Sequence, residues 1–208
     1  MEDSVILLCD IGNTSYHFLD TTHDYKENVD TFNPHTLEKK VYYICVNSSI
    51  SKILQGLENW IDVASMINMK PYYTTMGIDR IVACEAIQNG VIIDAGSAIT
   101  VDVVNDGVFE GGFIYPGVSA MEMTYKNISS ALDYSFNYEV DLENLPRNSQ
   151  DSISYGFLKT LYSEVMSYEK HIYLTGGDAI KLLSVFKNAQ HNNYLIFDGM
   201  KKIINKIR

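Results

Sequence analysis

Short apolar runs and amphipathic stretches alternate along this chain, which is the pattern of an α/β protein. Continuous or alternating apolar runs predict strands at 4–10, 15–20, 41–47, 90–96, 98–104, 108–117, the start of 171–179, and 194–200. Apolar residues at helical spacing predict helices at 48–61, 76–88, 119–132, 149–170 and 177–189, with a short basic helix after residue 200. The sequence Asn105-Asp106-Gly107 predicts a tight hairpin turn.

The pattern begins again half-way along the chain. Residues 7–14 read LLCDIGNT and residues 91–98 read VIIDAGSA, so each half contains an apolar strand that ends in aspartate, any residue and glycine. In each half a second strand follows directly, and strand–helix units come later. Such repetition indicates an internal duplication with a boundary near residues 88–90. We therefore expect an N-terminal domain over 1–88 and a C-terminal domain over 89–208.

The two glycine turns have the chemistry of a phosphate site. Glycine lets the backbone turn tightly and lets a ligand approach the amides, and Asn13, Thr14 and Ser97 would add short donors beside them. The aspartates cannot bind phosphate directly, but they can hold a magnesium ion that does, because Mg²⁺ prefers oxygen ligands. A third turn, TGGD at 175–178, lies between a strand and a helix, where a nucleotide could contact the backbone. Any one of these turns could be an ordinary tight turn, but their repetition favours the phosphate interpretation.

Composition and missing motifs narrow the function classes. The 208 residues are 46% hydrophobic and 20% charged, which favours a folded globular protein. A formal net charge of −10 argues against broad binding to nucleic acid or anionic membranes. The sequence contains no P-loop signature, no protein-kinase catalytic loop and no GxGxxG motif after a strand. The five histidines lack ligand spacing and no CxxC occurs, so a zinc site is not expected.

The chain has the features of a cytoplasmic protein. It begins with Met1 and the acidic residues Glu2 and Asp3 before a short apolar run, so no signal peptide is expected. No stretch approaches the roughly 18 apolar residues of a transmembrane helix. Cys9, Cys45 and Cys84 lie in or beside apolar runs, which is typical of buried free thiols in a reducing compartment.

Five motifs along the chain together resemble the type III pantothenate kinase family, within the superfamily of acetate and sugar kinases and actin. They are DIGNT (10–14), GIDR (77–80), DAGSAITVD (94–102), GGFIYPG (111–117) and LTGGDA (174–179), in the family's order. The resemblance implies an α/β protein with a duplicated actin-like (ribonuclease H-like) two-domain fold and ATP in a central cleft. It implies phosphorylation of the primary hydroxyl group of pantothenate to 4′-phosphopantothenate, the first step of coenzyme A biosynthesis. It also implies a homodimer that needs Mg²⁺ and a monovalent cation, K⁺ or NH₄⁺.

The same resemblance assigns roles to individual residues. It implies that Asp79 accepts the proton and that Asp94 binds the monovalent cation. From the preference of Mg²⁺ for oxygen ligands, we expect Asp10 to orient Mg²⁺ through water. The resemblance implies pantothenate contacts at Tyr73, Gly77, Ile78, Asp79, Arg80 and Ser149. It implies ATP contacts at Asp10, Ile11, Gly12, Asn13, Thr14, Ser15, Tyr16, His17 and Ser97.

The chain departs from the family at a few of these positions. Ser97 and Ile99 stand where the family usually has threonine, and Ser149 also falls at a family threonine. Serine keeps the hydroxyl group, so the contacts at Ser97 and Ser149 are still expected. The family's tyrosine lies further upstream of GIDR than either Tyr72 or Tyr73 does here, and we prefer Tyr73 as the pantothenate contact.

The residues themselves fit a phosphoryl transfer. A hydroxyl group that attacks a γ-phosphate needs in-line positioning, charge neutralisation and a carboxylate to accept its proton. Asp79 could be this carboxylate, although an acidic residue at a helix start can simply complement the helix dipole. Arg80 could hold the pantothenate carboxylate by a bidentate pair or make a surface ion pair. Asp102, on the same hairpin as Asp94, could assist or could be a solvated strand residue.

Two other functions use the same turns. A phosphatase of the superfamily, acting on polyphosphate or a guanosine polyphosphate, would need a residue that activates water. A non-catalytic regulator on this fold should have lost the base, whereas Asp79 is present. ADP release from ATP with pantothenate, compared with ATP alone, separates the three functions.

Overall fold

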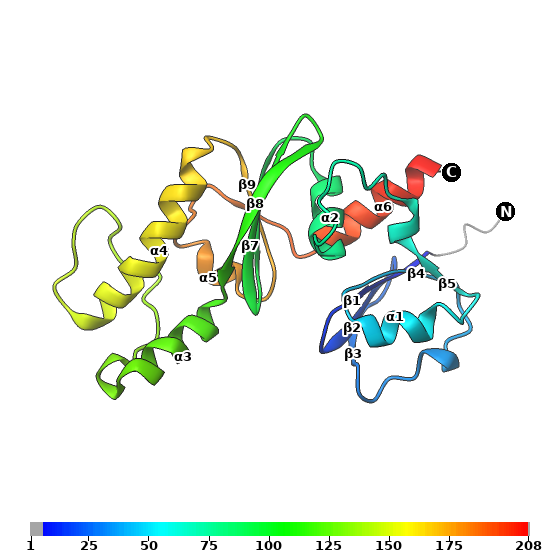
Figure 1. Cartoon of the computed structure of the whole chain (residues 1–208), viewed down its shortest axis with the longest axis horizontal. Helices are drawn as coiled ribbons and strands as arrows, with labels where there is room; N and C mark the ends of the chain where they lie inside the picture. The colour runs from blue at the N-terminus through cyan, green and yellow to red at the C-terminus, as the bar shows by residue number, and fades with distance from the viewer. Residues whose placement is uncertain (1–5, 208) are drawn as a thin grey trace. The chain divides into compact units, whose positions relative to one another are not determined.

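The computed structural model of the chain describes residues 6–207, which divide into two units (Figure 1). The first unit contains the described residues up to Ala86 together with those from Leu195 onward, and the second contains Ile87–Tyr194. The chain therefore returns to its first unit at its end, whereas the sequence predicted a single cut at residues 88–89. Within residues 6–207, no helix has the length and apolar character needed to cross a membrane.

The last helix explains this return. Helix α6 (Leu195–Ile207) packs beside α2 (Ile78–Ala86), as Figure 1 shows. Phe197 of α6 and Val82 of α2 are both buried in one apolar cluster. Gly199 lets the two helices approach closely, because a Cβ atom there would collide with the carbonyl oxygen of Val82. The apolar face of α6 is thus buried within the first unit.

The first unit is built on a mixed five-stranded sheet in the order β3-β2-β1-β4-β5. Strands β1, β2 and β3 are antiparallel neighbours, whereas β4 runs parallel to β1 and β5 parallel to β4. The elements of this unit besides α2 and α6 are β1 (Leu7–Ile11), β2 (Ser15–Leu19), β3 (Asp24–Asn28), η1 (Pro34–Thr36), β4 (Val41–Cys45), α1 (Ser48–Leu54), β5 (Trp60–Asp62) and η2 (Val63–Met66).

The second unit repeats this arrangement, with a sheet in the order β10-β9-β6-β7-β8. Strands β6, β7 and β8 are antiparallel neighbours, β9 runs parallel to β6, and β10 runs parallel to β9. With β6–β10 as counterparts of β1–β5, strand order and direction are identical in the two units, so the predicted duplication is confirmed. The elements are β6 (Gly90–Ala95), β7 (Ala98–Asn105), β8 (Val108–Pro116), α3 (Val118–Ile128), η3 (Ser130–Leu132), α4 (Ser149–Ser167), β9 (Ile172–Thr175), α5 (Ala179–Leu182) and β10 (Gln190–His191).

Apolar side chains of the strands form the buried clusters against which the helices pack. In the first unit, Ile11 and Phe18 are buried in a cluster with Leu54 of α1, while Ile44 joins the cluster that contains α2 and α6. In the second unit, Ile93 is buried together with residues of α4 and α5, and both helices lie on one side of the strands in Figure 1. The polar turns at the strand ends are therefore carried by two well-packed sheets.

Three predicted elements differ in the structure. The strand predicted at 194–200 was wrong and is the first part of α6, because a run of seven mostly apolar residues fits a buried strand and a buried helix alike. The helix predicted at 48–61 stops at Leu54, after which the chain forms β5. The helix predicted at 177–189 is only the short α5. Strand β3 was not predicted, because all five of its residues are exposed and no apolar alternation marks it.

Candidate functional site

The first glycine turn joins β1 to β2 and presents polar groups at its tip. Gly12 donates its backbone N–H to the carbonyl oxygen of Ser15 across the turn, at 3.0 Å. The side chains of Asn13 and Thr14 are exposed, and Asp10 is half-buried just before the turn. Two short polar side chains and a carboxylate therefore lie within five residues of one another.

Other side chains of the segment predicted to bind ATP have different surroundings. Ile11 is fully buried and Tyr16 is 2% exposed, and burial raises the pKa of Tyr16 to about 12. His17 Nε2 lies 2.7 Å from Asp24 Oδ1 on the neighbouring strand, and its ring packs edge-on against Phe197. Ile11 and Tyr16 can therefore contact a nucleotide only through their backbone, and the imidazole of His17 already has a carboxylate partner.

The GIDR segment begins α2 and is joined by a hydrogen bond to a preceding tyrosine. Asp79 Oδ1 accepts the backbone N–H of Arg80 at 2.9 Å. Arg80 Nη1 donates to the hydroxyl oxygen of Tyr73 at 2.6 Å, and its guanidinium carbon lies 5.9 Å from the centre of the Tyr73 ring. Arg80 is 6% exposed and Tyr73 is 45% exposed. The structure thus brings a carboxylate, a buried cation and an accessible phenol together, and Arg80 is not the surface residue of the alternative interpretation.

Gly77 allows this cluster to form. A Cβ atom at Gly77 would collide with Oδ1 of Asp79, so a larger residue would displace the carboxylate. Ile78, the next residue, packs its side chain against the core that α2 shares with α6. In GIDR, Gly77 therefore leaves room for the carboxylate, Ile78 anchors the helix start in the core, Asp79 supplies the carboxylate and Arg80 supplies the cation.

Three glycine-containing segments meet at one end of the second sheet. Asp178, in the TGGD turn, donates its backbone N–H to Ala95 at the end of β6, at 2.9 Å. Gly117, after β8, donates to the carbonyl oxygen of Ser97 at 3.1 Å. A Cβ atom at Gly117 would also lie 2.5 Å from the carbonyl oxygen of Gly96. The motifs DAGS, YPG and TGGD, which are far apart in sequence, are therefore neighbours, and Ser97, whose carbonyl oxygen accepts from Gly117, is exposed.

Asp94 lies in a row of oxygen-bearing side chains on this sheet. The strand register places it between Thr100 of β7 and Thr175 of β9. Among the described residues, Thr100 Oγ1 is buried without a hydrogen-bond partner, and Thr175 is 4% exposed. Carboxylate and hydroxyl oxygens are the ligands that hard cations prefer. Sequence reasoning did not find the two threonines, because only the register reveals which residues face Asp94.

In the part of the chain that the structure describes, these oxygens are not accompanied by a cluster of metal-binding side chains. Within residues 6–207, His, Cys, Asp and Glu side chains form no group of three that could hold a metal ion. A cation in either unit would therefore need ligands from hydroxyl groups, backbone carbonyls, water or phosphate oxygens. Mg²⁺ is commonly held in this way, through one or two carboxylates and substrate phosphates.

Two further predicted residues have clear positions in the second unit. Ser149 is exposed and is the first residue of α4, after Asn148, whose side chain caps the helix by accepting the N–H of Asp151 at 2.9 Å. Asp102 is 1% exposed and lies opposite Ile92 in the sheet. Asp102 is therefore a buried carboxylate and not a solvated strand residue.

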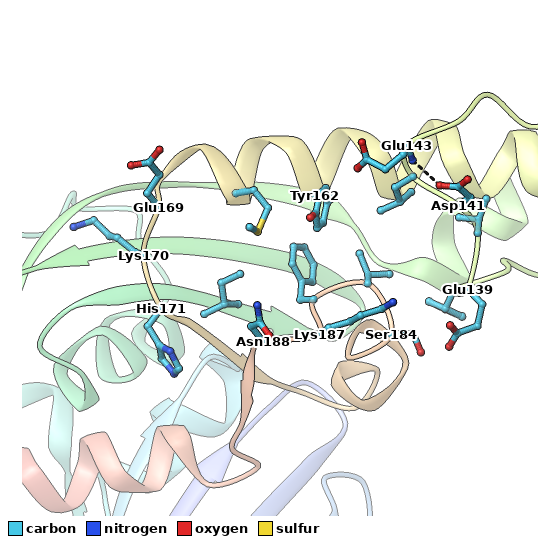
Figure 2. A pocket seen from close by; sticks show the side chains of 17 residues that line it. Glu139, Asp141, Glu143, Tyr162, Glu169, Lys170, His171, Ser184, Lys187 and Asn188 are labelled. Atoms are coloured by element: carbon cyan, nitrogen blue, oxygen red, sulfur yellow. Dashed lines mark hydrogen bonds between the residues drawn. The ribbon is translucent and has the colours of Figure 1, made fainter.

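A pocket of about 660 Å³ lies in the second unit, lined by α4, residues 138–143 and residues 184–188 (Figure 2). Phe186 stacks against Tyr162 within it, with ring centres 5.8 Å apart. The carboxylate, lysine and histidine side chains along it are Glu139, Asp141, Glu143, Glu169, Lys170, His171 and Lys187. Four carboxylates against two lysines disfavour a polyphosphate. None of the predicted site residues lines this pocket, so it is not where ATP is expected.

Comparisons with known proteins give matches along most of the chain. A family model described as type III pantothenate kinase matches residues 46–171. A type III pantothenate kinase from Sulfurimonas denitrificans is 57% identical over 201 residues, which cover 97% of this chain and 98% of that protein. A Campylobacter jejuni crystal structure described as a conserved Baf family transcriptional activator superposes with a TM-score of 0.86 at 39% identity, covering 97% of this chain and 98% of that one.

A more distant structure bears on the fold alone. Component A of (R)-2-hydroxyglutaryl-CoA dehydratase from Acidaminococcus fermentans superposes with a TM-score of 0.53 at 12% identity, over 98% of this chain and 99% of that one. Together with the identical strand order of the two units, this match confirms the duplicated actin-like fold that the motifs predicted.

Proposed function

Since this chain belongs to the type III pantothenate kinase family, we propose that it transfers the γ-phosphate of ATP to the primary hydroxyl group of pantothenate. The product is 4′-phosphopantothenate, and the reaction is the first step of coenzyme A biosynthesis. The observation that carries this conclusion is the match at 57% identity along nearly the whole of both chains. The presence of all five family motifs in order supports it.

The acceptor side of the reaction is assigned to the start of α2. The Arg80 guanidinium suits the carboxylate of pantothenate, because its planar donors match two oxygens. Tyr73, exposed beside Arg80, is the proposed phenol contact, with Gly77 and Ile78 shaping the site. Ser149 keeps the role that the family motif gives it, a hydroxyl contact to pantothenate.

Asp79 is the proposed general base. As the pantothenate oxygen bonds to the γ-phosphorus, the bond from that phosphorus to the bridging oxygen of ADP breaks and the hydroxyl proton moves to Asp79. A positioned carboxylate typically contributes about 10²–10⁴-fold in rate. The backbone N–H of Arg80 holds one Asp79 oxygen at 2.9 Å and so fixes the direction of the carboxylate.

The nucleotide side is assigned to the glycine turns. Amides and side chains of the first turn and the hydroxyl of Ser97 are proposed to contact the phosphates of ATP, with Ile11 and Tyr16 acting through their backbone only. The remaining proposed contacts of the segment from Asp10 to His17 are Asp10, Gly12, Asn13, Thr14, Ser15 and His17. Because glycine leaves the backbone accessible, phosphate oxygens can approach these amides closely.

Two cations belong to this proposal. Asp10 would orient Mg²⁺ through water, and Mg²⁺ would supply neutralisation of phosphate charge. Asp94, with the hydroxyl groups of Thr100 and Thr175 beside it in the register, would bind K⁺ or NH₄⁺. The buried Thr100 Oγ1, which lacks a hydrogen-bond partner among the described residues, fits a site that a cation completes.

A homodimer and a cytoplasmic location complete the proposal. Ile114 of β8 and Met123 of α3 are 61% and 55% exposed and would supply apolar area to the proposed subunit contact. The described chain has three free cysteines, Cys9, Cys45 and Cys84, as expected in a reducing compartment. Sedimentation at micromolar concentration tests the dimer, and a monomer there would contradict it.

The Campylobacter jejuni structure described as a transcriptional activator makes a regulator the second candidate. A regulator would bind its ligands without turnover, whereas a phosphatase would release phosphate from its substrate without pantothenate. The test is ADP release by the purified chain in ATP with Mg²⁺ and K⁺, with and without pantothenate. Release only with pantothenate supports the kinase, release without it supports a hydrolase, and no release in either case supports the regulator.

A further inference from the structure

Two adjacent tyrosines before α2 make different hydrogen bonds. Tyr73 accepts from Arg80 at 2.6 Å and remains 45% exposed. Tyr72 is half-buried, and its hydroxyl group donates to Glu85 Oε1 at 3.0 Å, near the other end of α2. Neighbouring residues of the same type are therefore held at two points of one helix, and only one of them faces outward.

Glu85 is itself held in place from a second direction. Its Oε2 accepts from Nζ of Lys206, on α6, at 2.8 Å. The Glu85 side chain is 18% exposed, while that of Lys206 is 58% exposed. Each carboxylate oxygen thus has its own donor, one from the segment before α2 and one from α6. Hydrogen bonds to an ionised carboxylate are shorter and stronger than neutral ones, so this arrangement fixes the Glu85 side chain.

The segment that carries the tyrosines needs such an anchor. Residues 67–77 contain no helix or strand. Short backbone hydrogen bonds hold it locally, from Tyr72 to Met69 at 3.1 Å and from Met76 to Tyr73 at 3.0 Å. Segments of this kind move more easily than helices and strands, because little of their backbone is held by regular structure. The ends of the segment are held by the core, since Ile67 packs against it and Met76 is buried, while the two tyrosines between them are tied to α2 by side-chain hydrogen bonds.

We propose that Glu85 is a positioning residue for pantothenate binding. By holding Tyr72 against α2, Glu85 fixes the backbone that also carries Tyr73, and so keeps the Tyr73 phenol beside Arg80. The inference rests on the proposed function, because it treats Tyr73 and Arg80 as pantothenate contacts. It also separates the two tyrosines: Tyr72 is the anchor and Tyr73 is the residue that meets the substrate.

The experiment compares Tyr72→Phe, Glu85→Ala and Glu85→Gln in steady-state kinetics with full-length enzyme. Tyr72→Phe and Glu85→Ala should raise KM for pantothenate about fivefold to tenfold, while KM for ATP and kcat change by less than about twofold. Glu85→Gln should restore most of the pantothenate affinity, because its amide oxygen still accepts from Tyr72.

Tyr168→Phe is the matched control. The Tyr168 hydroxyl donates to Glu164 Oε1 at 2.8 Å on α4, the same kind of bond at a position with no proposed role in the site. This variant should leave both KM values unchanged.

Three results would overturn the inference. Unchanged pantothenate KM in Tyr72→Phe and Glu85→Ala, with normal wild-type turnover, refutes the positioning role alone. An equal rise in both KM values means a general loss of structure and also refutes it. A wild-type enzyme that does not phosphorylate pantothenate refutes the proposed function and, with it, this role of Glu85.

Discussion

Replacing Gly176 with alanine should destabilise the second unit at the point where β9 meets the other glycine turns. Gly176 has a φ of 91°, a left-handed conformation that costs an L-residue about 1–2 kcal/mol. The added methyl group would also lie 2.5 Å from the backbone carbonyl oxygen of Ala95 and would touch the Asp94 carboxylate. A backbone carbonyl cannot move aside as the end of a flexible side chain can. Strain and crowding together should lower the free energy of unfolding by about 2–3 kcal/mol.

Calorimetry of Gly176→Ala and Gly177→Ala measures this effect with a matched control. Gly177 is the next residue, and a Cβ atom there meets nothing within 4 Å. Gly177→Ala should change stability by less than about 1 kcal/mol, whereas Gly176→Ala should lower Tm by roughly 4–12 °C. Turnover of Gly176→Ala should also fall, because the Asp94 carboxylate is displaced. Equal melting temperatures for the two variants would refute this reasoning.

Other predictions concern the carboxylates. Asp79→Asn should lower kcat by about 10²–10⁴ yet keep pantothenate affinity, since asparagine can still accept the N–H of Arg80. The control is Asp62→Asn, because Asp62 likewise accepts a backbone N–H, that of Ala64 at 2.9 Å, where it caps η2. A near-normal rate for Asp79→Asn would contradict the base assignment. Asp10→Ala should abolish Mg²⁺-dependent turnover with an unchanged Tm, and normal activity at low Mg²⁺ would count against its metal role. Wild-type rates should be higher in KCl than in NaCl at equal ionic strength, and Asp94→Asn should lose the difference; equal wild-type rates would rule out the cation site.

Much of the fold could be predicted because its signals are local. An apolar run ending in aspartate–x–glycine marks a strand and its turn, and two copies in one chain revealed the duplication. The turn at Asn105-Asp106-Gly107 was also predicted correctly, since Asp106 and Gly107 both have positive φ. The return of α6 to the first unit could not be predicted, because it depends on packing against α2.

The site was predictable to the extent that its residues lie close together in the sequence. Asp79 and Arg80 share one helix start, and their motif alone indicated a carboxylate and a cation at that point. The residues facing each aspartate depend instead on strand register. Asp10 lies opposite His17, while the shorter second turn places Thr100 opposite Asp94. No local sequence pattern predicts which residue pairs with each aspartate, because a register shift of one residue reverses which side chains share a face.

The measurement that tests the central claim most directly is phosphorus NMR of the product formed from ATP and pantothenate. The account predicts a phosphomonoester on the primary hydroxyl group of pantothenate, formed in equal amount to ADP, and no product from a pantothenate analogue that lacks this hydroxyl group. Inorganic phosphate as the sole new signal beside ADP, or no reaction in the presence of Mg²⁺ and K⁺, would contradict it.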